Sequence, residues 1–200
     1  MTSSFIPETK ARLAALDAAA CRELVEAAVR LPTAGDVAAL LDAFRGARGP
    51  SELLSPRLVR LHSASLSRAE ALQELAIMME ENGLADSRAE FERDLWKRED
   101  DFATGIGFGL AIPHCRTASV RGPAIAVLRF DAPVDWGSSD GVPVDLAIML
   151  AVPAAGQTLM HQKLLARLSR RLVHEEFREA LRAAKNEDDA VRLIRVAVTE

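Results

Sequence analysis

Two long apolar runs constrain the fold of this chain more than any other feature of its sequence. They are Ala124 to Phe130 (A-I-A-V-L-R-F) and Val144 to Val152 (V-D-L-A-I-M-L-A-V). Runs of this length that are almost continuously apolar are typical of strands buried on both faces of a sheet. Because such a sheet must be covered on both sides, amphipathic helices are expected before and after the two runs.

Helical patterns do flank the two runs. Ser67-Arg68-Ala69-Glu70 and Ser87-Arg88-Ala89-Glu90 both match a capping box, in which the serine accepts a bond from the amide three residues on. After the runs, an apolar stripe extends from Leu164 to Leu172, and Asn186 before Glu187-Asp188-Asp189 indicates another helix start. The sequence therefore predicts an α/β fold, a three-layer α/β/α sandwich with a central mixed sheet.

The first fifty residues have a different character. Residues 8–45 are alanine-rich with helical periodicity, interrupted at Leu31 to Gly35, and Gly46-Ala47-Arg48-Gly49-Pro50 is typical of a linker. We predict a helical N-terminal extension and linker over residues 1–50 and the main domain over residues 51–200. A short strand is expected near the start of the main domain, from Leu58 to His62.

Composition excludes several classes of function. The net charge is −4 and the basic residues are scattered among acids, which argues against a nucleic-acid partner. The N-terminus lacks the basic and then apolar pattern of a secretory signal, and the longest apolar segment, Val142 to Ala155, is too short to insert in a membrane. Two distant cysteines, Cys21 and Cys115, have no CxxC spacing. These features predict a cytoplasmic protein with reduced thiols.

The segment from Arg98 to Arg116 (R-E-D-D-F-A-T-G-I-G-F-G-L-A-I-P-H-C-R) carries the chemistry. Pro113 stiffens the entry into His114, and neutral imidazole is a good nucleophile near neutral pH. An arginine such as Arg98 suits phosphoryl oxygens because its planar fork donates two parallel bonds. The backbone can approach a ligand or itself closely at three alternate glycines, Gly105, Gly107 and Gly109. The segment therefore indicates a histidine that accepts a phosphoryl group.

From about Leu53 to the C-terminus the chain resembles enzyme IIA of the fructose/mannitol family. These are proteins of the bacterial phosphoenolpyruvate-dependent sugar phosphotransferase system. The resemblance is carried by Arg98-Glu99, Thr104-Gly105-Ile106-Gly107, Gly109, Ala111, Pro113-His114, Trp136, Asp140-Gly141, Pro143-Val144, His161, Leu164-Leu165 and Leu168. Phe108 departs from the small or polar residues frequent at its position in the family.

The resemblance implies a phosphotransferase component that carries phosphate stoichiometrically and needs no cofactor and no metal. His114 matches the phospho-acceptor, which forms a phosphohistidine. Arg98 matches the arginine that neutralises the phosphoryl group, and His161 matches a second active-site histidine that orients it. The phosphoryl loop would comprise Thr104 and three glycines, Gly105, Gly107 and Gly109.

The resemblance also implies partners on separate chains. The donor would be a histidine phosphocarrier protein, and the acceptor an enzyme IIB, which passes phosphate to sugar at a membrane permease. Trp136 and Asp140-Gly141 favour the sugar-specific branch over the nitrogen-regulatory branch. The helical extension leaves open a regulatory module whose phosphorylation state controls a partner protein.

Other interpretations are weaker. Gly105 to Gly109 lacks the final spacing of a dinucleotide-binding fingerprint. A metal-dependent hydrolase using His114, Cys115 and His161 ranks last, because no further Cys or His spacing completes a metal site. Without the resemblance, His161 would more often be a helix-terminal or core residue, and Arg98 a solvated member of the R-E-D-D cluster.

Overall fold

A computed structural model of the chain describes residues 18–29, 33, 36–37, 53–154 and 158–199. The chain divides into two compact units, Met1–Gly49 and Pro50–Glu200. In the first unit, helix α2 (Ala18–Val29) lies inside the segment predicted to be helical. The predicted linker and most of the helical segment expected after Gly35 lie outside the described residues. The predicted boundary between the extension and the main domain at residue 50 therefore stays a prediction.

The second unit is built on a mixed sheet of six strands: β1 (Val59–Ser63), β2 (Gly105–Gly107), β3 (Leu110–Ala111), β4 (His114–Thr117), β5 (Ala124–Val134) and β6 (Val144–Pro153). The strand order is β1-β5-β6-β3-β2, and β4 also pairs with β6. The long central strands β5 and β6 are antiparallel, while β1, β3 and β4 make parallel pairs with them. The two apolar runs of the sequence are these central strands.

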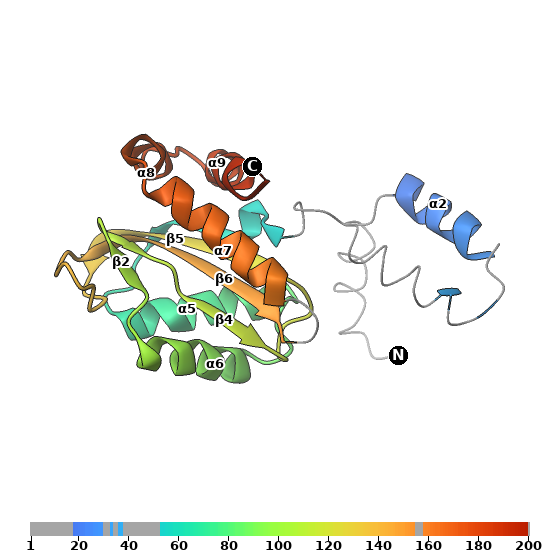
Figure 1. Cartoon of the computed structure of the whole chain (residues 1–200), viewed down its shortest axis with the longest axis horizontal. Coiled ribbons are helices and arrows are strands. Elements are labelled where there is room, and N and C mark those ends of the chain that lie inside the picture. The colour runs from blue at the N-terminus through green and yellow to red at the C-terminus, as the bar shows by residue number, and fades with distance from the viewer. Residues whose placement is uncertain (1–17, 30–32, 34–35, 38–52, 155–157, 200) are drawn as a thin grey trace. The chain divides into compact units, whose positions relative to one another are not determined.

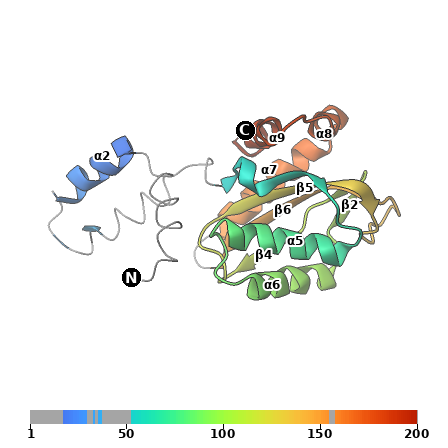
Figure 2. The same ribbon diagram turned by 180° about the vertical axis from the view of Figure 1, so that it is seen from behind.

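Helices cover both faces of the sheet (Figures 1 and 2). One face carries α5 (Arg68–Glu81) and α6 (Arg88–Asp101), and the other carries α7 (Thr158–Leu172), α8 (Glu175–Arg182) and α9 (Glu187–Thr199). Alternate residues of β5 enter different cores, because successive side chains of a strand point to opposite faces. Leu128 packs in the core with α5 and α6, and Val127 in the core with α7 and α9. The predicted three-layer α/β/α sandwich is confirmed.

The predicted helix starts are confirmed by their cap bonds. Ser67 Oγ accepts a bond from the Glu70 amide at 3.2 Å, and Ser87 and Asn186 make the corresponding bonds at the starts of α6 and α9. The return bond of the first capping box differs slightly, because the Glu70 carboxylate accepts from the amide of Leu66 at 2.7 Å. Among the helices described, none is both long enough and apolar enough to cross a membrane.

The glycine-rich segment, expected to be a loop, forms a β-hairpin from β2 and β3. A β-hairpin of such short strands has little sequence signal of its own, since it is held by pairing with a distant strand. Both β3 and β4 align along the same edge of β6, with Leu110 opposite Leu146 and His114 opposite Leu150. His114 is consequently the first residue of a sheet strand, and this makes its backbone position rigid.

Candidate functional site

The hydrogen bonds of His114 define its tautomer. Its Nδ1 lies 2.8 Å from the carbonyl oxygen of Ile112, and its Nε2 lies 3.0 Å from Nε of Arg98. A carbonyl oxygen can only accept, so Nδ1 carries the proton. Nε2 then accepts from the guanidinium. The two nitrogens therefore have different roles, and Nε2 is the one that faces a permanent positive charge.

Arg98 reaches His114 from the last turn of α6. This helix continues to Asp101, so the arginine stands on helical backbone. Its Nη1 also donates to the carbonyl oxygen of Phe102, at 2.9 Å. The structure thus brings together two of the predicted site residues, which lie on different elements, and it holds the arginine at two of its nitrogens.

The pKa of His114 is lowered from its ordinary value of 6.5. Burial is the largest cause, because a half-buried imidazolium loses hydration. The bond to the Ile112 carbonyl opposes this effect, the charge of Arg98 adds to it, and the charge of Glu99 opposes it. The imidazole is therefore neutral near pH 7, the state in which Nε2 retains a nucleophilic lone pair.

Glu99 is a buried residue that sequence reasoning did not assign to the site. It is 3% exposed, and its carboxylate accepts bonds from the amide of Thr104 at 2.9 Å, the hydroxyl of Thr104 at 2.6 Å and Nε1 of Trp136 at 3.0 Å. Arg68 approaches the same carboxylate at 3.6 Å. In the sequence Glu99 stands in an acidic cluster typical of a solvated helix end. Glu99, Thr104 and Trp136 all belong to the residues that carry the family resemblance, and this shared membership could have pointed to Glu99.

The structure places the predicted phosphoryl-loop residues in packing roles. Both polar groups of Thr104 that were expected to face a phosphoryl group donate to Glu99. A side chain at Gly105 would collide with the hydroxyl of Ser138. Two further glycines adopt left-handed backbone, with φ of 86° at Gly107 and 76° at Gly109. Contacts between these four residues and a phosphoryl group stay a prediction.

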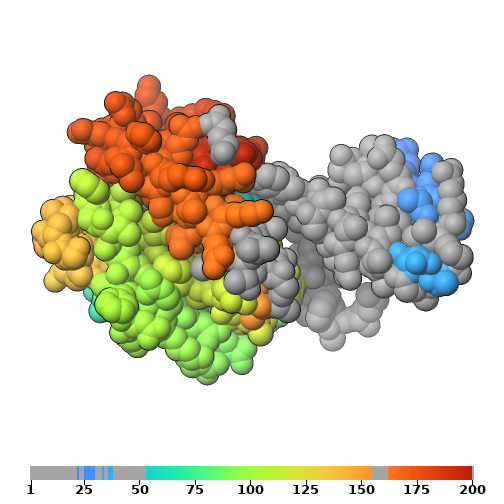
Figure 3. Space-filling model, viewed as in Figure 1, coloured from blue at the N-terminus to red at the C-terminus, as the bar shows by residue number. Residues whose placement is uncertain are grey.

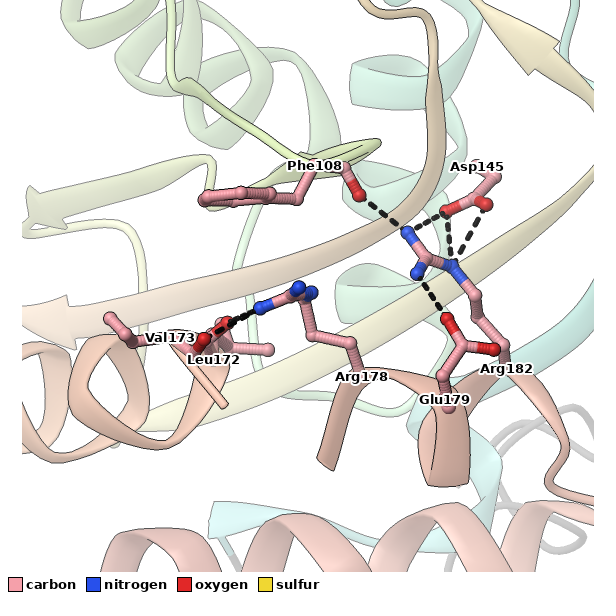
Figure 4. A network of polar contacts seen from close by, with 7 residues as sticks. All are labelled: Phe108, Asp145, Leu172, Val173, Arg178, Glu179 and Arg182. Atoms are coloured by element: carbon pink, nitrogen blue, oxygen red, sulfur yellow. Dashed lines mark hydrogen bonds and ion pairs between the residues drawn. The ribbon is translucent and has the colours of Figure 1, made fainter. Parts of the chain in front are cut away.

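The tip of the hairpin is held from two sides. The amide of Phe108 donates to Asp140 at 3.0 Å, and its carbonyl accepts from Arg182 at 2.5 Å. Arg182 also pairs with Asp145 at 2.9 Å, and the Arg178 guanidinium lies 4.5 Å from the centroid of the Phe108 ring (Figure 4). These contacts fix a residue whose own φ of 59° is unusual for a side chain as large as phenylalanine.

His161 is only partly described. Its backbone belongs to the first turns of α7, and its side chain lies outside the described residues. In the space-filling view, α7 (orange) and the green segment around residues 100–116 share one face of the molecule (Figure 3). The predicted contact between His161 and His114 therefore stays a prediction.

Cys115, the neighbour of His114, behaves as a core residue. Burial raises the pKa of its thiol to about 12, so that the thiol is protonated. In the part of the chain that the structure describes, no group of three or more His, Cys, Asp or Glu side chains is arranged to hold a metal ion.

Comparisons with known proteins identify a family for this chain. Residues 52–196 match the family described as phosphoenolpyruvate-dependent sugar phosphotransferase system, EIIA 2. A multiphosphoryl transfer protein of Escherichia coli O157:H7 is 36% identical over 199 residues, which is 100% of this chain and 24% of that protein. The fructose-specific EIIABC component of Bacillus subtilis is 36% identical over 144 residues, 72% of this chain and 22% of that protein.

The fold of the chain is similar to that of a solved structure. The nitrogen regulatory protein IIA-Ntr from Neisseria meningitidis superimposes with a TM-score of 0.67 at 28% identity, covering 72% of this chain and 97% of that one. The chain spans about a quarter of the length of the two curated relatives, at 24% and 22%. With the family matched over most of its length, the chain belongs to the EIIA 2 phosphoryl carriers of the phosphoenolpyruvate-dependent sugar phosphotransferase system.

Proposed function

We propose that His114 accepts a phosphoryl group on Nε2 from a histidine phosphocarrier protein and passes it to an enzyme IIB. One observation carries this proposal. The Ile112 carbonyl binds the protonated nitrogen Nδ1, and the nucleophilic nitrogen Nε2 faces Arg98. A histidine with this tautomer can attack phosphorus with Nε2 without first losing a proton.

In the transfer step, one P–N bond replaces another. The lone pair of Nε2 forms a bond to phosphorus while the P–N bond of the donor phosphohistidine breaks, and that electron pair returns to the donor ring. The Nδ1 proton stays on the bond to Ile112 throughout. Arg98 moves its hydrogen bond from Nε2 to the phosphoryl oxygens, where charge stabilisation supplies most of the catalysis. His161 would contact the same oxygens from α7.

The sugar-specific branch is our first choice of pathway. The multiphosphoryl transfer protein of E. coli is similar over the whole chain, the N-terminal unit included, and the Bacillus relative is described as fructose-specific. We therefore propose a role in fructose-type sugar uptake. The second candidate is a regulatory module of the nitrogen type, favoured by the likeness to IIA-Ntr. In that role phosphorylation would control a partner protein.

Phosphoryl labelling tests the proposal. The chain is incubated with labelled phosphoenolpyruvate, enzyme I and the phosphocarrier protein, and acid-labile phosphate is expected on His114. A wild-type chain that takes up no label, or a His114→Ala variant that labels normally, would refute the assignment. His161→Ala should slow transfer but leave the acceptor in place, and an unchanged rate would remove His161 from the site.

The fate of the phosphate after labelling separates the two branches. In the sugar pathway the labelled chain loses its phosphate to a fructose-type enzyme IIB. In the regulatory role, deletion of residues 1–50 spares labelling but abolishes binding of a partner protein that responds to phosphorylation. Rapid transfer to enzyme IIB by both the whole chain and the deletion variant supports the transport role.

A further inference from the structure

The buried carboxylate of Glu99 has no role in the transfer step described above. Burying an ionised carboxylate is costly unless it is paired and fully hydrogen-bonded. The structure provides that compensation, with two donors from Thr104, one from Trp136 and the charge of Arg68. Glu99 lies one residue from Arg98, so the compensated carboxylate is next to the site.

On the side of His114, a chain of hydrogen bonds leads from this carboxylate to the imidazole. Glu99 accepts from the amide of Thr104 at 2.9 Å, the carbonyl of Thr104 accepts from the amide of Ile112 at 3.0 Å, and the carbonyl of Ile112 accepts from Nδ1 of His114 at 2.8 Å. Each residue is thereby fixed by the one before it. The orientation and the tautomer of the imidazole depend on the placement of Ile112, which depends on Thr104.

On the side of Arg98, the same carboxylate fixes the end of α6. Its bond to Trp136 joins the last turn of the helix to the chain just beyond β5. Its bonds to Thr104 close the short segment in which Phe102 accepts from Arg98. Glu99 thus fixes both the helix end that carries Arg98 and the segment with the Phe102 carbonyl, which is the second acceptor of the guanidinium.

We propose that Glu99 is a positioning residue for phosphoryl transfer, which holds Arg98 and His114 in register through Thr104 and Trp136. This inference rests on the proposed function of His114. It acts through geometry, because both carboxylate oxygens of Glu99 accept hydrogen bonds from Thr104 or Trp136. A misplacement of about 1 Å in an active site can lower a rate by roughly a hundredfold.

The charge of Glu99 gives a separate signature. Among the described residues, the charged groups that shift the pKa of His114 both come from α6: Arg98 lowers the pKa of the imidazole and Glu99 raises it. Removal of the Glu99 charge must therefore lower the pKa of His114 further. At neutral pH the imidazole is neutral with or without that change, so a rate loss there does not come from protonation of His114.

Glu99→Gln is the test, because it keeps the shape and removes the charge. Glu74→Gln is the matched control. Glu74 is also a poorly exposed carboxylate that accepts bonds from two hydroxyls and an arginine, but it lies on α5 and does not contact the site. Both variants should unfold at lower urea concentration. Glu99→Gln should also label roughly 10- to 100-fold more slowly from the phosphocarrier protein, while Glu74→Gln labels at the wild-type rate.

NMR titration of His114 in the unphosphorylated protein provides a readout that a purely structural role would not change. Its pKa should fall in Glu99→Gln and stay in place in Glu74→Gln. If Glu99→Gln fails to fold, Thr104→Val replaces it, since valine keeps the shape and removes one donor to the carboxylate. Thr104→Val should label more slowly than the wild type, and Thr104→Ser, which keeps the hydroxyl that donates to Glu99, should recover part of the lost rate.

Defined outcomes overturn the proposal. They are a Glu99→Gln rate equal to wild type, an equal rate loss in Glu74→Gln, or a Thr104→Val variant that labels as fast as Thr104→Ser. Failure of the underlying function looks different, because wild-type protein then takes up no label at all. The titration of His114 needs no phosphoryl donor protein, so it can be interpreted whether or not the wild-type protein takes up label.

Discussion

Arg98 is the residue whose replacement tests the site most directly. We expect Arg98→Ala to slow phosphoryl transfer to His114 while leaving the fold intact. The guanidinium is half-buried at the end of α6 and its Nε lies 3.0 Å from the attacking nitrogen. The side chain is polar and lies outside the two hydrophobic cores, so its loss should affect chemistry more than stability.

The size of the effect can be estimated from the contact. A hydrogen bond from a charged donor contributes about 1.5–3 kcal/mol, and about 1.4 kcal/mol changes a rate tenfold. Solvent reaches a half-buried arginine and weakens its field, so we expect the lower part of the range, roughly a 10- to 50-fold loss. Arg98→Lys should fall between the wild type and Arg98→Ala, because lysine keeps the charge but lacks the planar fork.

The assay is rapid-quench labelling from the phosphorylated donor protein. It should be run at about pH 8, well above the ordinary histidine pKa, because loss of Arg98 also raises the pKa of His114 and must not be mistaken for lost catalysis. Arg116→Ala is the matched control. Arg116 is exposed on the same strand as His114 and bonds to the carbonyl of Ala154. Arg98→Ala labelling at the wild-type rate, or an equal loss in Arg116→Ala, would refute the assigned role.

Three other measurements test the same region of the molecule. Because burial lowers the pKa of His114 below 6.5, the labelling rate should stay constant through neutral pH and fall only in acid. The stability due to the neutral imidazole is likewise lost as pH falls through this lowered pKa. A midpoint above 6.5 in the pH–rate profile would contradict the burial effect. Gly105→Ala should lower the free energy of unfolding, measured in urea, by about 1–3 kcal/mol because the new Cβ collides with Ser138. The control Gly122→Ala should leave this free energy unchanged, because its Cβ meets nothing within 4 Å. Equal losses of stability in the two variants would count against a packing role for Gly105. Cys115, with its pKa raised to about 12, should resist alkylation in the native protein at mildly alkaline pH and react in denaturant, and fast native alkylation would be inconsistent with its burial.

Much of the fold is encoded in short-range patterns. The serine caps of α5 and α6 need only a residue and the amide three positions on, so the sequence alone locates them. The apolar runs that become β5 and β6 identify buried strands because a strand covered on both faces has no polar positions to spare. The resemblance to the enzyme IIA family also singled out Arg98 and His114, since it depends on residue types and their spacing along the chain.

The sequence by itself therefore determined the layers, the family and the residue types of the site. Only the tertiary structure decided how they meet, because the contacts that matter join segments far apart in the chain. The short strands β3 and β4 exist through pairing with β6, which places His114 at the start of a sheet strand. The carbonyl of Ile112 selects the tautomer of His114 through backbone geometry that no residue type encodes. Glu99 is buried because Trp136, from the chain just beyond β5, covers it; a charge cluster in sequence cannot reveal which of its members folding will remove from water.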